Sequence, residues 1–470
     1  AQAILAQASW IQRIPSKALN RCSCSCKIVE MAMESFALES LSFVFADRNT
    51  VPGWMGMDVQ AEIIQHILDV KPDKIMLLTD KGAAKHHASY FDPLIEKAEV
   101  VQHCLPEGDA CKSWDHLSFL MRWAFDIGAT KKSIVVAWGG GALLNLAGLF
   151  ASILYRGTKL IYVPTTLLAM HDVVTSLKTS ICFDGRKNNI GSFYAPLKIL
   201  IDVAFCRTLP AAELFSGLGE LAKNACLLGG KHAEGFVEAL TKESADGDSS
   251  DSSAEFRLSD ATLLTLTRLG IEAKMTVLLT DAYEKTSGMI FEYGHTVSHA
   301  IEKAYGDGTI PHGLGVTYGM ISSSYAAEKL GIMKAADREK HDELCWLLLK
   351  KWPLPEPLPS AAMVMERAMR DSKRGICSEN AEEISDVLLY KMGDIVPSKT
   401  QMLSKFPAKL VLEWLHKMGF PAEAEADCVL GEEEGSEVAK PAPVTPAPAP
   451  GGYPTKNFLP EAKDSVVMGA

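Results

Sequence analysis

Histidines and a glutamate in the second half of the sequence are spaced for metal binding. Glu292-Tyr-Gly-His295-Thr-Val-Ser-His299 places two imidazoles four residues apart, on one face of a helix, and His312 follows in Ile-Pro-His-Gly. A carboxylate and imidazoles in a helical region suit Zn²⁺ or Co²⁺ with one coordination position left open. The pattern is not HExxH, so it does not indicate a zinc protease. Spacing alone also allows histidines that are hydrogen-bonded within a core.

Two further groups of charged residues are candidates for binding an anionic substrate. Lys178 and Lys187-Asn188 follow the turn Pro164-Thr165-Thr166, and lysine binds phosphate as a point charge. Glu220 and Lys223 lie three residues apart in a helical run and therefore share a face of that helix. The alternatives are solvated lysines in the first case and a surface ion pair in the second.

A triple glycine, Gly139-Gly140-Gly141, follows one apolar run and precedes another. Glycine lets backbone N–H groups approach a pyrophosphate at the positive end of a helix. The run does not match GxGxxG, so a tight turn without a ligand is the alternative interpretation.

The elements that must position these residues change in character along the chain. Periodic segments separate short apolar runs in the first half, which predicts an α/β domain with a parallel sheet. Beyond Leu209-Pro210, amphipathic segments such as 212–228 and 292–305 predict helices. We place a domain boundary near Arg207 and expect the site in the cleft between the domains, at the carboxyl ends of the strands. The apolar runs are 42–46, 74–78, 100–104, 134–138, 160–163 and 199–203.

The composition excludes several classes of protein. Of 470 residues, 47% are hydrophobic, which argues against a disordered chain, and the net charge of −11 argues against a protein that binds nucleic acid. Eleven scattered cysteines without a CxxC pair support neither a disulfide framework nor a zinc ribbon, and favour a reducing compartment. Residues 133–155 carry no charge, but the triple glycine interrupts them, so we interpret them as a buried strand and helix rather than a membrane span.

The two ends differ in composition from the rest of the chain. Residues 1–33 are poor in acidic residues and predict a leader or a plastid targeting segment, without which a cytoplasmic protein is expected. Residues 421–470 are rich in Pro, Ala and Glu and predict a disordered tail. The ordered chain is then divided into an α/β domain at 34–207 and a helical domain at 208–420.

Several motifs occur together in an order that resembles the sugar phosphate cyclases, the family of 3-dehydroquinate synthase. The resemblance covers roughly residues 40–420. It implies a Rossmann-like NAD-binding domain, a helical metal-binding domain, NAD and a divalent metal (Zn or Co) as cofactors, a phosphorylated sugar as substrate, and a homodimer that contacts neither nucleic acid nor membrane. The motifs are Gly139-Gly-Gly, Val163-Pro-Thr-Thr, Lys187-Asn188, Gly217-Leu-Gly-Glu-Leu-Ala-Lys223, Tyr293-Gly-His-Thr and His312-Gly.

The resemblance also assigns roles to individual residues. Glu220, His295 and His312 match the metal ligands, whereas His299 matches a residue beside the substrate. Arg156 matches an arginine that reaches the phosphate site of a neighbouring subunit. Positions that match contacts to substrate or its phosphate are Lys178, Lys187, Asn188, Lys223 and Lys274. Positions that match NAD contacts are Asp109, Lys112, Gly139, Gly140, Gly141, Thr165, Thr166 and Asp172.

Two departures from dehydroquinate synthases bear on the substrate. Those enzymes carry Asn at the position of Glu292 and, at the position of Gly288, an Arg that binds a substrate carboxylate. No cation lies between Ser287 and Gly294, and a buried carboxylate without a partner costs several kcal/mol. Glu292 suits the hydroxyls of a neutral sugar terminus. The chain therefore resembles the branch of the family that converts glucose 6-phosphate to 2-deoxy-scyllo-inosose by phosphate elimination; dehydroquinate synthesis and an NAD-dependent polyol dehydrogenase are the alternatives.

Overall fold

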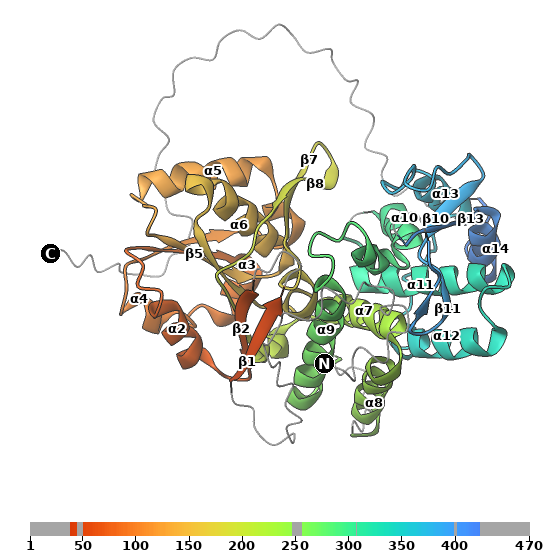
Figure 1. Cartoon of the computed structure of the whole chain (residues 1–470), viewed down its shortest axis with the longest axis horizontal. Coiled ribbons are helices and arrows are strands. Elements are labelled where there is room, and N and C mark those ends of the chain that lie inside the picture. Colours follow the sequence, from red (N-terminus) through yellow and green to blue (C-terminus); the bar gives the residue numbers. More distant parts are fainter. Residues whose placement is uncertain (1–37, 45–49, 247–255, 307, 399–401, 424–470) are drawn as a thin grey trace, which may run out of the picture. The chain divides into compact units, whose positions relative to one another are not determined.

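Apolar runs in the first part of the chain form a mostly parallel sheet (Figure 1). The computed structural model describes residues 38–44, 50–246, 256–306, 308–398 and 402–423, so the predicted leader at 1–33 and the tail from 424 lie outside the described residues. The strand order is β1-β2-β9-β6-β5-β3-β4, and only β1 runs antiparallel to its neighbour. The strands are β1 (Glu39–Val44), β2 (Thr50–Gly56), β3 (Ile75–Asp80), β4 (Val100–Leu105), β5 (Ile134–Gly139), β6 (Lys159–Pro164) and β9 (Lys198–Asp202).

The centre of this sheet is covered on both faces. Every residue of β3 and β5 is buried, as expected of parallel strands between helices. The predicted parallel α/β architecture is therefore confirmed. Strand β2 was not among the predicted strands, because Pro52 and Gly53 interrupt its apolar pattern.

The charge-free segment 133–155 forms a strand and a helix, as predicted. Strand β5 ends at the triple glycine, and Gly140 is the N-cap of α6. None of the described helices combines the length and apolarity needed to cross a bilayer. The helices that accompany the sheet are α2 (Gln60–Leu68), α3 (Lys81–His87), α4 (Asp92–Ile95), α5 (Trp114–Asp126) and α6 (Gly141–Ile153).

The segment of chain that connects β6 to β9 forms a two-stranded hairpin outside the main sheet. Its strands β7 (Lys178–Phe183) and β8 (Arg186–Phe193) pair only with each other among the described strands. Strand β7 packs against α6, and the Cys182 N–H donates to the Lys112 carbonyl at 2.7 Å. The hairpin, yellow in Figure 1, carries the predicted phosphate-binding residues.

The second part of the chain is mostly helical, as predicted, and begins with α7 nine residues after β9 ends. It also contains two short strand pairs, which differ from the expected all-helical domain. The tight turn at Gly393, whose φ is 80°, joins one of these pairs. The elements are α7 (Ala211–Leu228), α8 (Gly230–Asp246), α9 (Asp260–Leu278), α10 (His295–Tyr305), α11 (His312–Lys329), α12 (Ala335–Leu349), α13 (Ala361–Ala368), α14 (Lys409–Lys417), β10 (Glu383–Asp386), β11 (Leu389–Lys391), β12 (Asp394–Ile395) and β13 (Ser404–Pro407).

Two glycines allow α7 and α11 to approach closely. A Cβ added to Gly219 would lie 2.0 Å from the Gly313 carbonyl oxygen, and one added to Gly313 would lie 2.4 Å from the Ser216 carbonyl oxygen. Any larger residue at either position would force the helices apart. The contact places Glu220, next to Gly219, beside His312, next to Gly313.

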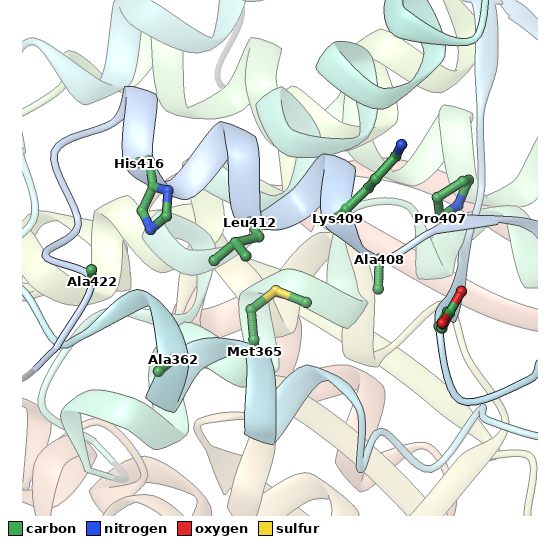
Figure 2. Close-up of a pocket in the computed structure, with 9 residues that line it drawn as sticks. Ala362, Met365, Pro407, Ala408, Lys409, Leu412, His416 and Ala422 are labelled. Atoms are coloured by element: carbon green, nitrogen blue, oxygen red, sulfur yellow. The ribbon is translucent and has the colours of Figure 1, made fainter.

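A surface hollow lies between α13 and α14 (Figure 2). Met365 and Leu412 supply its apolar lining, and Lys409 and His416 lie along it. None of the residues predicted for the functional site lines this hollow. This hollow is therefore separate from the predicted site residues.

Candidate active site

Three helices bring the predicted metal ligands together. Glu220 lies in the middle of α7, whereas His295 and His312 are the first residues of α10 and α11. The Glu220 Oε1 atom lies 3.3 Å from His295 Nε2 and 3.4 Å from His312 Nε2. One donor atom from each side chain falls within 4.8 Å of the others. This donor group, Glu220, His295 and His312, matches a three-ligand divalent site with an open position.

Hydrogen bonds orient both imidazoles toward Glu220. The Nδ1 atom of His295 lies 3.1 Å from the Tyr293 carbonyl oxygen, and that of His312 lies 2.9 Å from Glu302 Oε1. Carbonyl and carboxylate acceptors behind metal-binding histidines fix the tautomer and direct Nε2 to the ion. Glu302 was not predicted, because its contact with His312 follows from the packing of α10 against α11.

The Glu220 carboxylate is buried and ionised. Burial alone would raise its pKa, but Lys223, His295 and His312 hold the pKa well below its usual range. Lys223 forms an ion pair with Glu220 Oε2, yet neither carboxylate oxygen has a hydrogen bond of good geometry within the described chain. Buried carboxylate oxygens with unused capacity next to two imidazoles fit a divalent cation.

Buried Lys274 lies in the same region and connects the two parts of the chain. Its Nζ atom lies 2.9 Å from Asp172 Oδ1 and 3.9 Å from the centre of the Phe291 ring. Asp172 belongs to a short π-helical turn, η5 (Ala169–Val173), and α9 packs against that turn. Asp172, predicted as an NAD contact, thus faces a lysine predicted as a substrate contact.

Glu292 is paired with a lysine that the local sequence does not reveal. Lys373 Nζ lies 3.4 Å from Glu292 Oε2 and 2.9 Å from Asp371 Oδ1. Sequence analysis assumed that no cation lies near Glu292, because residues 287–294 contain none. The structure corrects this assumption, since Lys373 supplies a cation from another segment. Lys373 faces two carboxylates, so this lysine by itself does not neutralise both. Burial opposes ionisation of Glu292, but Lys373, His295, Lys178 and His299 lower its pKa to about 2.

His299 lies beside the donor group but is not a member of it among the described residues. Its ring centre is 5.3 Å from that of His295, and its Nδ1 atom is 3.6 Å from Asp371 Oδ2. That His299 contacts the substrate and not the metal stays a prediction. Asp371 and Lys373 were not predicted as site residues, because the sequence Asp371-Ser-Lys373 matches no motif of known spacing.

The hairpin brings a second set of predicted residues together. Lys187 Nζ lies 3.1 Å from Asp109 Oδ2, and Lys112 Nζ donates to Asn188 Oδ1. Asn188 has a φ of 58°, a left-handed conformation that asparagine tolerates well. Residues predicted for NAD, Asp109 and Lys112, thus contact residues predicted for the substrate phosphate.

Lys178 connects the hairpin to the helical part. Its Nζ atom lies 2.8 Å from Glu284 Oε2, while Ser176 Oγ donates to Glu284 Oε1 at 2.7 Å. Glu284 is buried, whereas the Lys178 side chain is 47% exposed. Glu284 was not predicted, because nothing in its local sequence indicates an acceptor for a lysine that is distant in the chain.

The triple glycine lies at the carboxyl end of β5, where α6 begins. The Gly140 N–H donates to Asp80 Oδ2 at 3.0 Å, and the Thr165 N–H donates to the Gly139 carbonyl at 3.0 Å. A Cβ at Gly139 would lie 2.4 Å from Asp80 Oδ2. Thr165 and Thr166 follow the neighbouring strand β6, so both turns share the edge at which open parallel sheets bind ligands.

Arg156 is separated from these contacts. It is exposed and has a φ of 65°, at the end of the short helix η4 (Leu154–Arg156). Its side chain forms no hydrogen bond or ion pair with the other predicted residues in the described part of the chain. Its role in a neighbouring subunit stays a prediction.

Comparison with known proteins agrees with this arrangement. Models of the 3-dehydroquinate synthase N-terminal and C-terminal regions match residues 102–216 and 217–374. The chain is 33% identical over 383 residues to 2-deoxy-scyllo-inosose synthase of Streptomyces kanamyceticus, covering 80% of this chain and 94% of the relative. It is 31% identical to the Streptomyces fradiae enzyme of the same name, covering 82% of this chain and 84% of the relative.

Solved structures show the same fold. A 2-deoxy-scyllo-inosose synthase complexed with carbaglucose-6-phosphate, NAD⁺ and Co²⁺ superposes with a TM-score of 0.68 and 28% identity, covering 81% of this chain and all of that one. A 2-epi-5-epi-valiolone synthase from Streptomyces hygroscopicus, with NAD⁺ and Zn²⁺ bound, has a TM-score of 0.63 at 21% identity and covers 78% of this chain and 96% of its own. The chain therefore belongs to the 3-dehydroquinate synthase family of enzymes.

Proposed function

We propose that this enzyme is a phosphate-eliminating cyclase that converts glucose 6-phosphate to 2-deoxy-scyllo-inosose. The choice of substrate rests on two carboxylates beside the donor group. Glu292 and Asp371 both contact the same lysine, Lys373. Two such carboxylates accept hydrogen bonds from sugar hydroxyls and repel a substrate carboxylate. The names of the relatives and the phosphorylated analogue in the related structure support the same substrate class.

The cofactor assignments are part of this proposal. Glu220, His295 and His312 would hold the divalent ion, and the turns at Gly139–Gly141 and Thr165–Thr166 would hold NAD. When bound, the ion would lower the pKa of a substrate hydroxyl, and NAD would accept a hydride and later return it. The turn at the triple glycine lies at the N-terminus of an apolar helix and at the carboxyl edge of the sheet, a position that suits the pyrophosphate of a dinucleotide.

The side chains of the protein would bind and orient the substrate. Lys178, Lys187 and Asn188 on the hairpin would hold the phosphate before and during its departure, as donors to developing negative charge. Glu292 would accept hydrogen bonds from hydroxyls at the other end of the sugar. His299, which faces Asp371, would exchange a proton with the substrate, because an imidazole oriented by a carboxylate is suited to proton transfer.

A carboxylated heptulosonate, the substrate of dehydroquinate synthesis, is the second candidate. Lys373 favours it, because this lysine supplies a cation near Glu292. Lys373 already contacts two carboxylates, however, so a substrate carboxylate would have to compete with Glu292 and Asp371 for this lysine.

One incubation distinguishes the two substrates. Protein is supplied with NAD⁺, Co²⁺ and either glucose 6-phosphate or the heptulosonate, and released phosphate and the carbocyclic product are measured. We expect phosphate and 2-deoxy-scyllo-inosose from glucose 6-phosphate without accumulation of NADH. Efficient formation of dehydroquinate would overturn the substrate assignment, and stoichiometric NADH would indicate a polyol dehydrogenase. Glu220→Gln serves as the inactive control.

The domain boundary near Arg207 and the assembly of the enzyme into a homodimer are also proposals.

A further inference from the structure

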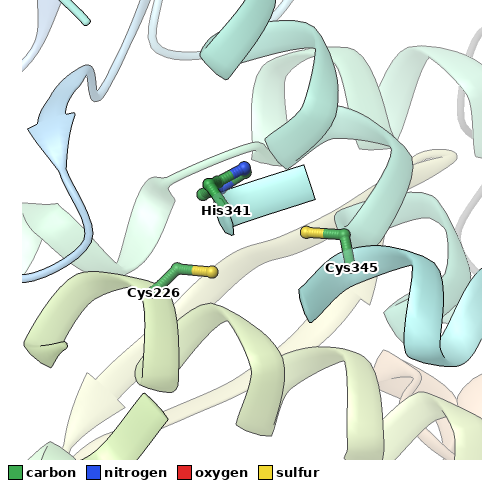
Figure 3. A group of neighbouring side chains, drawn as sticks. All are labelled: Cys226, His341 and Cys345. Atoms are coloured by element: carbon green, nitrogen blue, oxygen red, sulfur yellow. The ribbon is translucent and has the colours of Figure 1, made fainter. Parts of the chain in front are cut away.

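A second group of metal-type ligands lies farther along the helix that carries Glu220. Cys226 lies near the carboxyl end of α7, and His341 and Cys345 lie four residues apart on α12 (Figure 3). One donor atom from each of the three falls within 4.8 Å of the others. All three side chains are fully buried. None of them belongs to the donor group of the proposed active site.

The surroundings orient His341 as in a metal site. Its Nδ1 atom lies 2.8 Å from Asp342 Oδ1, and its Nε2 atom lies 2.9 Å from Tyr293 Oη. Ser324 Oγ also donates to Asp342 Oδ1 at 2.7 Å, which fixes that carboxylate. An imidazole that donates Nδ1–H to a carboxylate presents the lone pair of Nε2 to a metal. The Tyr293 hydroxyl could still donate its hydrogen to the Met320 carbonyl oxygen, which lies 3.4 Å away.

Charge balance favours a divalent cation at this position. Two thiolates and one dipositive ion sum to zero charge, so burial would not leave a net charge away from water. Thiolate and imidazole ligands select Zn²⁺ over Mg²⁺ or Ca²⁺.

We propose that Cys226, His341 and Cys345 form a second metal site, which takes Zn²⁺ and is completed by the hydroxyl of Tyr293. Tetrahedral zinc takes four donors, and the Tyr293 oxygen is the polar atom next to His341 Nε2. The inference rests on this cluster alone and is independent of the proposed substrate. Such an ion would tie α7 to α12 and, through Tyr293, to the turn that precedes His295.

Cobalt spectroscopy tests the proposal on the full chain. Thiolate ligands give Co²⁺ an intense charge-transfer band in the near ultraviolet, which the oxygen and nitrogen donors of the Glu220 group cannot produce. We expect this band in wild-type protein after metal removal and reloading with Co²⁺. It should persist in Glu220→Gln/His295→Ala, which disrupts the other donor group, and disappear in Cys226→Ser/Cys345→Ser. Cys206→Ser changes an equally buried thiol outside the cluster and should retain it.

Metal content supplies the second measurement. Mass spectrometry of the native protein should find one more Zn²⁺ per chain in the wild type than in Cys226→Ser/Cys345→Ser. Zinc should also raise the unfolding temperature of Glu220→Gln/His295→Ala. A wild-type protein without the charge-transfer band would overturn the site regardless of how the variants fold. A disulfide between Cys226 and Cys345 in the purified native protein would overturn it as well.

Discussion

The donor group on the helices and the lysines on the hairpin are built in opposite ways. Glu220 is buried, His295 and His312 are 12% and 33% exposed, and the helices that carry Glu220 and His312 are in backbone contact. Further hydrogen bonds support both histidines. Lys178 and Lys187 are 47% and 42% exposed, and each reaches a carboxylate of another element. The donor group is pre-organised for a metal ion, whereas the hairpin lysines must give up contacts with protein carboxylates when they bind a phosphate. Single substitutions should therefore cause a large loss of metal binding in the donor group and a smaller change in substrate binding at the hairpin.

The largest effect is expected from Glu220→Gln. The neutral amide cannot balance a divalent ion, so the affinity of the donor group for Co²⁺ and the turnover should both fall by more than about a hundredfold, since loss of a residue that merely supports a ligand already costs about 10–100-fold. The loss of one Co²⁺ per chain on dialysis, relative to the wild type, and the rate of phosphate release measure the two effects. Glu272→Gln, in an exposed pair with Lys231, is the matched control. The same Co²⁺ content as the wild type, together with lost activity, would contradict the ligand assignment.

The next largest effect is expected from Glu302→Gln. Its carboxylate holds His312 Nδ1 at 2.9 Å, so the amide should weaken metal binding about 10–100-fold while excess metal restores much of kcat. Titration of activity against Co²⁺ measures this. Glu366→Gln removes a carboxylate from an exposed ion pair and should leave the titration unchanged. A loss of kcat that excess metal cannot restore would mean that Glu302 acts on the substrate.

Lys187→Ala should weaken binding of the phosphorylated substrate and leave metal binding intact. A hydrogen bond to a charged group contributes about 1.5–3 kcal/mol, so KM should rise roughly 10–100-fold. Steady-state kinetics and the Co²⁺ titration separate the two properties. Lys159→Ala, which removes an exposed lysine at the start of β6, is the control. An unchanged KM would show that the hairpin lysine does not contact the substrate.

The smallest effect is expected from Glu284→Gln. The amide keeps the shape of the contact with Lys178 but removes its charge, which frees the lysine for a phosphate. Because an ion pair with one exposed partner contributes about 0–1 kcal/mol, KM should fall only a few-fold. Lys178→Ala combined with Glu284→Gln should abolish this gain. A rise in KM for Glu284→Gln would indicate that Glu284 positions Lys178 for binding.

The sequence predicted the residues with distinctive local patterns and missed those that act through packing. Buried strands such as β5 and the helix that contains Glu220 were evident from apolar runs and periodicity. The ligand set Glu220, His295 and His312 came from the family resemblance, whereas the four-residue spacing alone would have paired His295 with His299. Lys373, Glu302 and Glu284 were missed, because each meets its partner only when distant segments pack together. Strand β2 was missed because Pro52 and Gly53 hide its pattern.

The contact of Gly219 with Gly313 has a consequence for the order of folding. The residues that would bind the ion lie at positions 220, 295 and 312, so a complete donor group exists only after α7 and α11 have docked. Contacts between residues distant in sequence form late, because chain closure costs entropy before the contact repays it. Uptake of Co²⁺ by the Glu220 donor group during refolding, followed in the Cys226→Ser/Cys345→Ser variant, would therefore time the docking of these two helices.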